Sequence, residues 1–339
     1  MSWTILVTGG AGFIGSNFVH HVLRTYPSYR VINLDKLTYS GNLNNLKGVA
    51  GDPRHEFVQG DIAVEEVVKP LVARSDAVVN FAAESHVDRS IDDPRVFLLT
   101  NIEGPYALLE ASRAAKVERF LQVSTDEVYG EVPAGHSRED DRLAPRSPYS
   151  ASKAGGELLV ASYYVTYRLP TLVTRGSNTI GPYQYPEKVV PLFITNALED
   201  KPLPIYGPGK AVRDYLHVED HCRAIDVVLH HGAPGEAYNI GAGNEVNTIE
   251  LATAILARLG KPGSLMRHVQ DRPGHDLRYS VSTEKIGTLG WKLRCSFEES
   301  LAMTIAWYRE NEWWWRPIKE GEYARWYARH YHLPDPAKS

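Results

Sequence analysis

The chain has 339 residues, of which 43% are hydrophobic and 23% are charged, and its formal net charge is −4. This length allows two domains or one large α/β body with an attached lobe. The charge excludes the basic surface of a dedicated nucleic-acid binder, and no apolar run approaches the roughly 18 residues of a membrane span. With only two cysteines and no signal-peptide pattern, we expect a cytoplasmic protein without disulfides or membrane contact.

The first half of the chain alternates short β-branched runs with helix-compatible stretches. We expect strands at 5–7, 30–34, 56–59, 77–81, 120–123 and 172–174, and helices at 13–26, 64–73 and 96–115. This alternation predicts an α/β fold, a Rossmann-type doubly wound parallel sheet with right-handed crossovers.

The sequence changes in character after residue 177. Six prolines interleaved with aromatic residues between 181 and 208 indicate a loop-rich lobe and not another βα unit. We therefore expect a Rossmann domain at 1–177, with a returning segment around 214–240, and a smaller, discontinuous, mixed α/β substrate-binding lobe at 178–339. Five of the seven tryptophans lie between Trp307 and Trp326, and we expect them to pack this lobe.

A glycine-rich segment, Gly9-Gly10-Ala11-Gly12-Phe13-Ile14-Gly15, joins the first expected strand to the first helix. Its glycines allow a tight turn and a close approach to a pyrophosphate, whose charge is favoured at a helix N-terminus. Asp35 ends the second strand, where a carboxylate meets the ribose hydroxyls of NAD and repels the 2′-phosphate of NADP, although the adjacent Lys36 weakens that distinction. The segment predicts NAD binding. Asp61 and Ile62 are either an adenine contact or a simple helix cap.

Tyr149 and Lys153 lie four residues apart, in Tyr149-Ser150-Ala151-Ser152-Lys153. On a helix these positions share one face, and a lysine ammonium beside a phenol favours the phenolate and lowers the pKa of the tyrosine. Behind a dinucleotide fingerprint, the pair predicts a base that takes a hydroxyl proton while hydride leaves the same carbon. Two surface residues on a helix are the alternative.

A second polar group, Ser124-Thr125-Asp126-Glu127, follows the strand at 120–123. The carboxyl ends of parallel strands face the ligand crevice, so Thr125 is placed to hydrogen-bond the same substrate hydroxyl as Tyr149. Asp126 and Glu127 are either a helix N-cap or a general acid and a general base whose environments separate their pKa values.

These motifs make the chain resemble the extended short-chain dehydrogenase/reductase family, and more closely its sugar-nucleotide dehydratase branch, the dTDP-glucose 4,6-dehydratases. The acid pair at 126–127 is the most telling motif, because sugar-nucleotide epimerases of the family typically lack it. The resemblance covers residue 4 to about 310. The matching segments are 8–15, 35–39, 82–90, 124–130, 149–153, 181–183 with 186–188, and 271–276.

The resemblance implies a hydro-lyase that oxidises dTDP-glucose at C4 with NAD. Tyr149, helped by Lys153 and Thr125, would deprotonate the C4 hydroxyl. Glu127 would then remove the C5 proton while Asp126 protonates the departing C6 hydroxyl, so that water is lost. Hydride would return to C6, giving dTDP-4-keto-6-deoxyglucose, and NAD would stay tightly bound through the cycle.

The resemblance implies which residues hold the nucleotide end of the substrate. By this resemblance Arg213 and Arg272 bind the diphosphate, a role that suits a guanidinium because it pairs phosphate oxygens in a bidentate way, and Tyr206 stacks on the base. The expected cofactor residues are Gly9, Gly12, Phe13, Ile14, Gly15, Asp35, Lys36, Thr38, Asp61, Ile62, Ala82, Ala83, Glu84, Ser85, Thr100, Tyr149 and Lys153. The expected substrate residues are Ser85, His86, Thr125, Asn178, Lys188, Val189, Pro204, Tyr206, Arg213, Asn247, Asp271, Arg272 and His275.

Other functions remain open. The same dehydration on another sugar nucleotide, such as UDP-glucose, would differ in a few lobe residues. A sugar-nucleotide 4-epimerase would return hydride to C4, and the acid pair argues against it. A non-catalytic NAD-binding scaffold would not need Tyr149, Lys153 and the acid pair together.

Two further expectations concern metals and assembly. His217 and His221 are four residues apart, but their order is not the H-E-x-x-H of zinc proteases and no third ligand is evident, so no metal site is predicted. The resemblance implies a homodimer formed through helices around 96–115 and 149–168.

Overall fold

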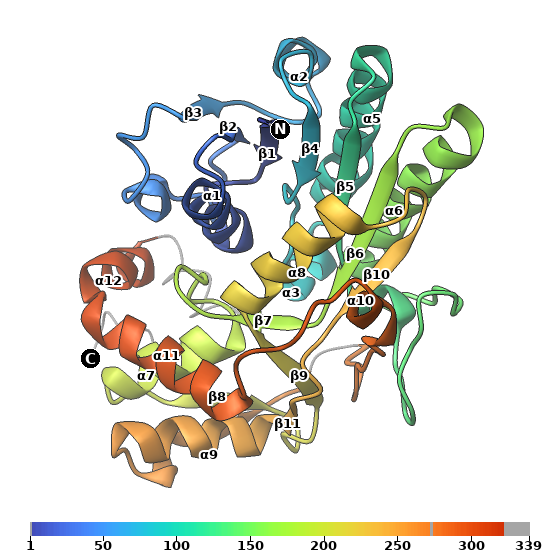
Figure 1. Cartoon of the computed structure of the whole chain (residues 1–339). Coiled ribbons are helices and arrows are strands. Elements are labelled where there is room, and N and C mark those ends of the chain that lie inside the picture. Colours follow the sequence, from blue (N-terminus) through green and yellow to red (C-terminus); the bar gives the residue numbers. More distant parts are fainter. Residues whose placement is uncertain (1, 272–273, 322–339) are drawn as a thin grey trace.

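The computed structural model describes residues 2–271 and 274–321. Its centre is a seven-stranded parallel sheet with the order β10-β6-β5-β4-β1-β2-β3, in which chain order reverses between β1 and β4 (Figure 1). The strands are β1 (Thr4–Thr8), β2 (Arg30–Asp35), β3 (His55–Gln59), β4 (Ala77–Asn80), β5 (Arg119–Thr125), β6 (Thr171–Gly176) and β10 (Ala237–Ile240). This is the Rossmann-type sheet that the sequence predicts.

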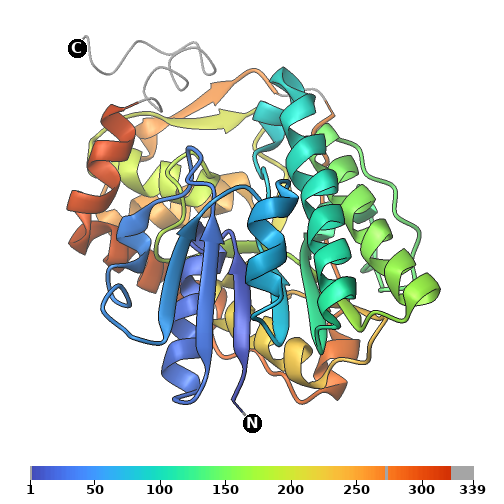
Figure 2. The same ribbon diagram turned by 90° about the horizontal axis from the view of Figure 1, so that it is seen from above.

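Helices cover both faces of this sheet, which explains why its central strands are continuous apolar runs. On one face, α1 (Phe13–Thr25) and α8 (Val218–His231) pack onto β1, β4 and β5. On the other face lie α2 (Glu65–Val72), α5 (Gly104–Ala115) and α6 (Pro148–Tyr167), seen in front of the strands in Figure 2.

A second body of the fold lies beyond the carboxyl ends of the sheet (Figure 1). It contains a mixed three-stranded sheet, β11-β9-β7, and a two-stranded sheet, β12-β8. Its core includes the buried side chains of Phe193, Leu301 and Tyr308. Its elements are β7 (Asn178–Ile180), α7 (Val189–Leu198), β8 (Leu203–Tyr206), β9 (Val212–His217), β11 (Glu245–Asn247), α9 (Thr248–Leu259), β12 (Met266–Val269), α11 (Phe297–Glu310) and α12 (Glu312–Glu320).

Short elements complete the chain, and two of them differ from expectation. The helix expected at 96–115 is interrupted by a π-helical turn at Leu99–Glu103 between α4 (Pro94–Leu98) and α5. The proline-rich stretch holds α7 and β8, because Pro191 falls in the first turn of α7, where a missing N–H costs no helical hydrogen bond. The remaining short elements are 3₁₀ turns at Leu43–Leu46, Asp126–Tyr129 and Gly263–Leu265, with α3 (Val87–Asp92) and α10 (Glu284–Thr288).

The tryptophans of the C-terminal region mostly pack the second body, as expected. Trp314 and Trp315 are buried, whereas Trp313 is exposed and Trp326 lies outside the described residues. The indole N–H of Trp314 donates to Asn45 Oδ1 over 2.7 Å, which links α12 to the segment after β2. No helix within 2–271 or 274–321 combines the length and the apolar character of a bilayer span.

Candidate active site

The glycine-rich turn after β1 is held by a backbone hydrogen bond to β2 and by close packing among its own glycines. Gly9 has a φ of +70°, and its N–H donates to the carbonyl of Leu34 over 2.8 Å. A Cβ at Gly15 would lie 2.3 Å from the carbonyl oxygen of Gly9, so only glycine fits there. This close packing brings the N-terminus of α1 against the turn, an arrangement that suits a pyrophosphate.

Asp35 supports this turn from the end of β2. Its two carboxylate oxygens accept hydrogen bonds from the N–H groups of Ala11 (2.9 Å) and Leu37 (2.8 Å). Burial raises the pKa of Asp35, and these two hydrogen bonds oppose the rise. Lys36 is paired with Asp61 at 2.7 Å, so its charge is partly neutralised there. The site therefore suits the ribose hydroxyls of NAD better than a 2′-phosphate.

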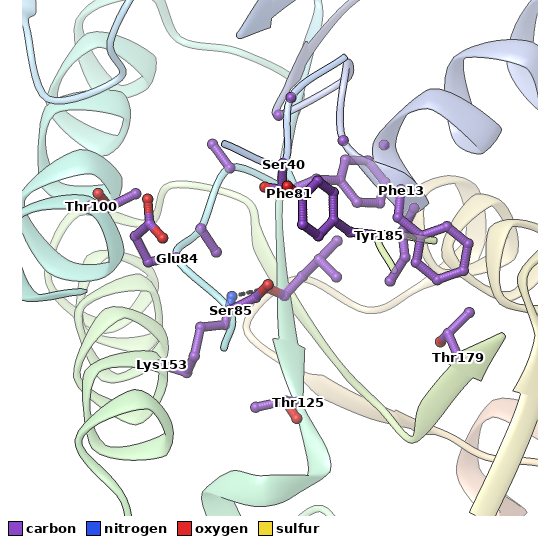
Figure 3. Close-up of a pocket in the computed structure, with 18 of the residues that line it drawn as sticks. Phe13, Ser40, Phe81, Glu84, Ser85, Thr100, Thr125, Lys153, Thr179 and Tyr185 are labelled. Carbon is purple, nitrogen blue, oxygen red and sulfur yellow. Dashed lines mark hydrogen bonds between the residues drawn. The ribbon is translucent and has the colours of Figure 1, made fainter. Parts of the chain in front are cut away.

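A cavity of about 280 Å³ runs from this turn across the carboxyl ends of the strands. All seventeen residues expected to contact the cofactor, from Gly9 to Lys153, line it. Figure 3 shows how Phe13, Phe81 and Tyr185 lie together in this cavity, apart from Lys153 and Thr125. The fit with a dinucleotide rests on two features: a glycine cradle at one end, and at the other the buried Oγ atoms of Ser124 and Ser177, which have no hydrogen-bond partner within the described chain.

The π-helical turn at Leu99–Glu103 has a structural role beside this cavity. Its Asn101 accepts a hydrogen bond from the N–H of Glu84 (2.9 Å) and donates to the carbonyl of Glu84 (3.0 Å) and to Ser152 Oγ (2.8 Å). Asn101 thereby fixes the segment after β4 to α6. Irregular helical turns of this kind are frequent at functional sites.

Tyr149 and Lys153 are both buried on the first two turns of α6. The Lys153 ammonium donates to the carbonyl of Val123 over 2.7 Å (Figure 3), and burial lowers the pKa of Lys153 to about 8. Burial, reinforced by the negative charge of Glu127, raises the pKa of Tyr149, and only a hydrogen bond with Thr125 opposes this. The sequence predicts that Lys153 lowers the pKa of Tyr149. In the chain without ligand the pKa of Tyr149 is raised instead.

The pKa of the Asp126 carboxyl is strongly perturbed. Burial, together with the adjacent Glu127, raises its pKa to about 8. Thr125 donates to Asp126 Oδ1 over 3.2 Å, while Oδ2 has no hydrogen-bond partner within the described chain. Asp126 is thus protonated at neutral pH and able to give a proton. Thr125 also caps the 3₁₀ turn by accepting from the N–H of Glu127, and Asp126 and Glu127 both lie in the first turn behind this cap.

A second cavity, of about 170 Å³, lies between the sheet and the second body and shares Ser85, Glu127 and Asn178 with the first. Arg213 lines it, with its guanidinium donating to the carbonyls of Val212 (2.8 Å) and Asp276 (3.0 Å) and stacked 4.3 Å from the ring of Tyr279. The expected substrate residues that line this cavity are Ser85, His86, Asn178, Lys188, Val189, Pro204, Tyr206, Arg213 and His275.

Three expected substrate residues do not line the second cavity, and a fourth lies outside the described residues. Thr125 lines the first cavity. Asn247 caps α9 by accepting from the N–H of Glu250 (2.9 Å) and lines neither cavity. Asp271 contacts His275 at 2.7 Å and lines neither. Arg272 lies outside the described residues.

The histidines at 217 and 221 contact protein atoms. His217 Nδ1 accepts from the N–H of Glu219 at the start of α8, and His221 Nδ1 lies 2.7 Å from Thr179 Oγ1. Within the described residues no three His, Cys, Asp or Glu side chains form a cluster that could hold a metal ion.

Comparisons of the sequence and the structure with known proteins show the family to which the chain belongs. The sequence profile described as GDP-mannose 4,6 dehydratase matches residues 6–304. The chain belongs to the sugar-nucleotide 4,6-dehydratase family.

Relatives within this dehydratase family are similar over almost the whole chain. A dTDP-glucose 4,6-dehydratase of Streptomyces niveus is 50% identical, covering 94% of this chain and 97% of the relative. The low-salt glycan biosynthesis protein Agl12 of Haloferax volcanii is 51% identical over 90% of this chain and 98% of the relative. The crystal structure of the dTDP-glucose 4,6-dehydratase DesIV from Streptomyces venezuelae, with NAD bound, superposes with a TM-score of 0.92 at 50% identity, covering 93% of this chain and 100% of that one.

Several residues of this dehydratase-family site are not among those predicted from sequence. Ser124 belongs to a motif that the sequence does single out, but no recognisable pattern marks Gly176, at the end of β6, or Ser177, which follows it. Gln184 and His221 also line the first cavity, and Thr248 lines the second. No sequence signal marks His221 as a cavity residue, because its partner Thr179 is 42 positions away.

Proposed function

We propose that this chain is an NAD-dependent dTDP-glucose 4,6-dehydratase, which converts dTDP-glucose to dTDP-4-keto-6-deoxyglucose and water. The observation that carries the proposal is the carboxyl pair at the junction of the two cavities. Asp126 is buried with a pKa of about 8, while the adjacent Glu127 lines both cavities. One group is therefore ready to give a proton beside another that can accept one.

The residues of the site divide the proton transfers among them. Tyr149 takes the proton of the C4 hydroxyl, with Thr125 as its hydrogen-bonding neighbour. The hydrogen bond from the Lys153 ammonium to the carbonyl of Val123 holds the lysine side chain in the site. Glu127 removes the C5 proton, and Asp126 protonates the C6 hydroxyl as it leaves. NAD, when bound against the first cavity, supplies the acceptor for the C4 hydride and a positive charge that favours the phenolate of Tyr149.

The second cavity supports a nucleotide diphosphate as the other half of the substrate. Two backbone carbonyls and the Tyr279 ring hold Arg213 in one orientation, which prepares its guanidinium for phosphate oxygens. Tyr206 donates its hydroxyl to Asp88 Oδ2 over 3.1 Å and lies edge-on to His275. A tyrosine fixed in this way suits stacking on a base.

The direct test compares substrates and products. Purified protein is incubated with dTDP-glucose, UDP-glucose or no sugar, and products are separated by chromatography and weighed by mass spectrometry. We expect loss of one water from dTDP-glucose, with a higher kcat/KM than for UDP-glucose. An epimerised product of unchanged mass would support the 4-epimerase instead, and binding without turnover would support a scaffold.

We also propose a homodimer that acts in the cytoplasm. The turns from α4 to α5 expose Leu99 and Tyr106, and α6 exposes Leu158 and Val165, of which the last two are seven residues apart and so lie on one face of α6. Such apolar surface on adjacent helices suits a second copy of the chain. Sedimentation should give a dimer, and Val165→Glu should give a monomer; a monomeric parent protein would contradict the proposal.

The two cysteines are both free thiols, which supports a reducing compartment.

A further inference from the structure

His221 is a buried side chain that the proposed proton transfers do not use. It lies in the first turn of α8 and is 2% exposed. Burial lowers the pKa of its imidazole to about 4, so the ring is neutral at neutral pH. A neutral imidazole has one nitrogen that donates and one that accepts.

The hydrogen bonds around Thr179 decide which nitrogen is which. Thr179 Oγ1 lies 2.7 Å from His221 Nδ1 and donates to the carbonyl of Ser177 over 3.2 Å. A threonine hydroxyl has one hydrogen, so both contacts are satisfied only if His221 Nδ1–H donates to Thr179. In this arrangement Nε2 carries no hydrogen and is an acceptor.

That acceptor has no hydrogen-bond partner within the described chain, although the ring is almost fully buried. The Cε1–Nε2 edge of His221 lies over Gly176: a Cβ at Gly176 would be 2.5 Å from Cε1 and 2.7 Å from Nε2. Both residues line the first cavity and neither lines the second. An unpaired buried acceptor is costly, and a donor on the ligand of the first cavity would satisfy it.

The position along the cavity identifies that donor. Gly176 pairs with Thr125 across β5 and β6, which places His221 near the catalytic end of the cavity and away from Asp35. A dinucleotide bound with its ribose at Asp35 would place its nicotinamide at this end, and the carboxamide NH₂ of the nicotinamide is a hydrogen-bond donor. Thr179, which anchors the imidazole, is one of the labelled residues in Figure 3 and lies apart from Lys153 across the cavity.

We propose that His221 Nε2 accepts a hydrogen bond from the nicotinamide carboxamide of NAD, with Thr179 as the residue that sets its tautomer. The inference rests on the proposed use of NAD. His221 would then be a positioning residue that fixes the rotation of the nicotinamide ring beside Tyr149.

The test uses 3-acetylpyridine adenine dinucleotide, in which a methyl ketone replaces the carboxamide and no N–H remains. Purified holoenzyme is equilibrated with mixtures of NAD and this analogue, and the ratio of bound nucleotides is measured by mass spectrometry. We expect the parent protein to prefer NAD about tenfold, the size expected for one buried hydrogen bond. His221→Leu should bring the ratio close to one.

Matched variants keep the test decisive. Thr179→Val removes the hydroxyl that sets the tautomer and should lower the preference, whereas Thr179→Ser keeps the hydroxyl and the preference. His217→Gln changes a neighbouring buried histidine that does not line the first cavity and should leave the ratio unchanged.

Three results would overturn the inference: equal retention of both nucleotides by the parent protein, an unchanged preference in His221→Leu, or a His221→Leu effect confined to the KM for dTDP-glucose, which would assign Nε2 to the sugar. The nucleotide ratio does not require turnover. Failure to dehydrate dTDP-glucose would therefore contradict the proposed function alone.

Discussion

Thr125 donates a hydrogen bond to Oδ1 of Asp126 over 3.2 Å, and Oδ2 of the same carboxyl lies buried without a hydrogen-bond partner in the described chain. A protonated carboxyl suits this environment, because one oxygen accepts from the threonine while the other can carry the proton toward a ligand. The first two predictions follow from this arrangement.

Asp126→Asn should slow water loss about 10²–10⁴-fold, the usual contribution of a positioned general acid. Asparagine fills the same space but cannot give a proton to the departing C6 hydroxyl. Oxidation at C4 does not need this proton, so the bound nucleotide should accumulate in its reduced form, which absorbance measures. Asp140→Asn, at an exposed position, is the control, and normal water loss by Asp126→Asn would contradict the assigned acid.

The raised pKa of Asp126 predicts two pH effects. The kcat should fall as the pH rises through about 8, because Asp126 then loses the proton that it gives. The carboxyl also holds its proton more tightly in the folded chain than in the unfolded chain. Its contribution to stability is therefore fully present below about pH 4 and is lost as the pH rises through about 8. Unfolding titrations should show this slope, and Asp126→Asn should reduce it; an identical slope in both proteins would contradict the assignment.

Gly15→Ala should weaken NAD binding about tenfold or more. The new Cβ would lie 2.3 Å from the carbonyl oxygen of Gly9, and overlap of this kind typically costs about 1–3 kcal/mol. Gly51→Ala is a matched control, since a Cβ there meets nothing within 4 Å. The NAD content of the purified proteins, measured after denaturation, should fall only in Gly15→Ala. Equal contents would show that the turn tolerates a side chain.

Glu157→Ala should lower the free energy of unfolding by about 3–5 kcal/mol, the usual cost of leaving a buried charge unpaired. Glu157 lies 2.7 Å from Arg175 in a buried ion pair, and Arg175 also donates to the hydroxyl of Tyr129 over 2.6 Å. Glu65→Ala removes an exposed ion pair with Lys69 and should cost at most about 1 kcal/mol. Denaturant titration measures both, and similar losses would contradict a structural role for the buried pair.

The Rossmann sheet and the cofactor cavity could be predicted from local patterns. The glycine turn, Asp35 and the Tyr149–Lys153 spacing are each set by a few neighbouring residues, and all of them reach one cavity. The π-helical turn at Leu99–Glu103 could not be predicted, because Asn101 is held by contacts to Glu84 and Ser152, 17 and 51 positions away.

The pKa shifts and the long-range contacts of the site also could not be predicted from the sequence. The spacing of Tyr149 and Lys153 indicates that they share a helix face, but it does not show that Lys153 bonds to the Val123 carbonyl or that burial raises the tyrosine pKa. The sequence likewise contains the His217–His221 pair without showing that Gly176 makes room for His221. Such effects depend on which residues the fold brings together.

The most direct test of the central claim follows hydride from C4 to C6 of the sugar. The protein is incubated with dTDP-glucose carrying deuterium at C4, and the product is examined by NMR and mass spectrometry. The proposed function predicts loss of one water and deuterium at C6, and no transfer in Tyr149→Phe. Deuterium retained at C4 in an epimerised sugar of unchanged mass would contradict it.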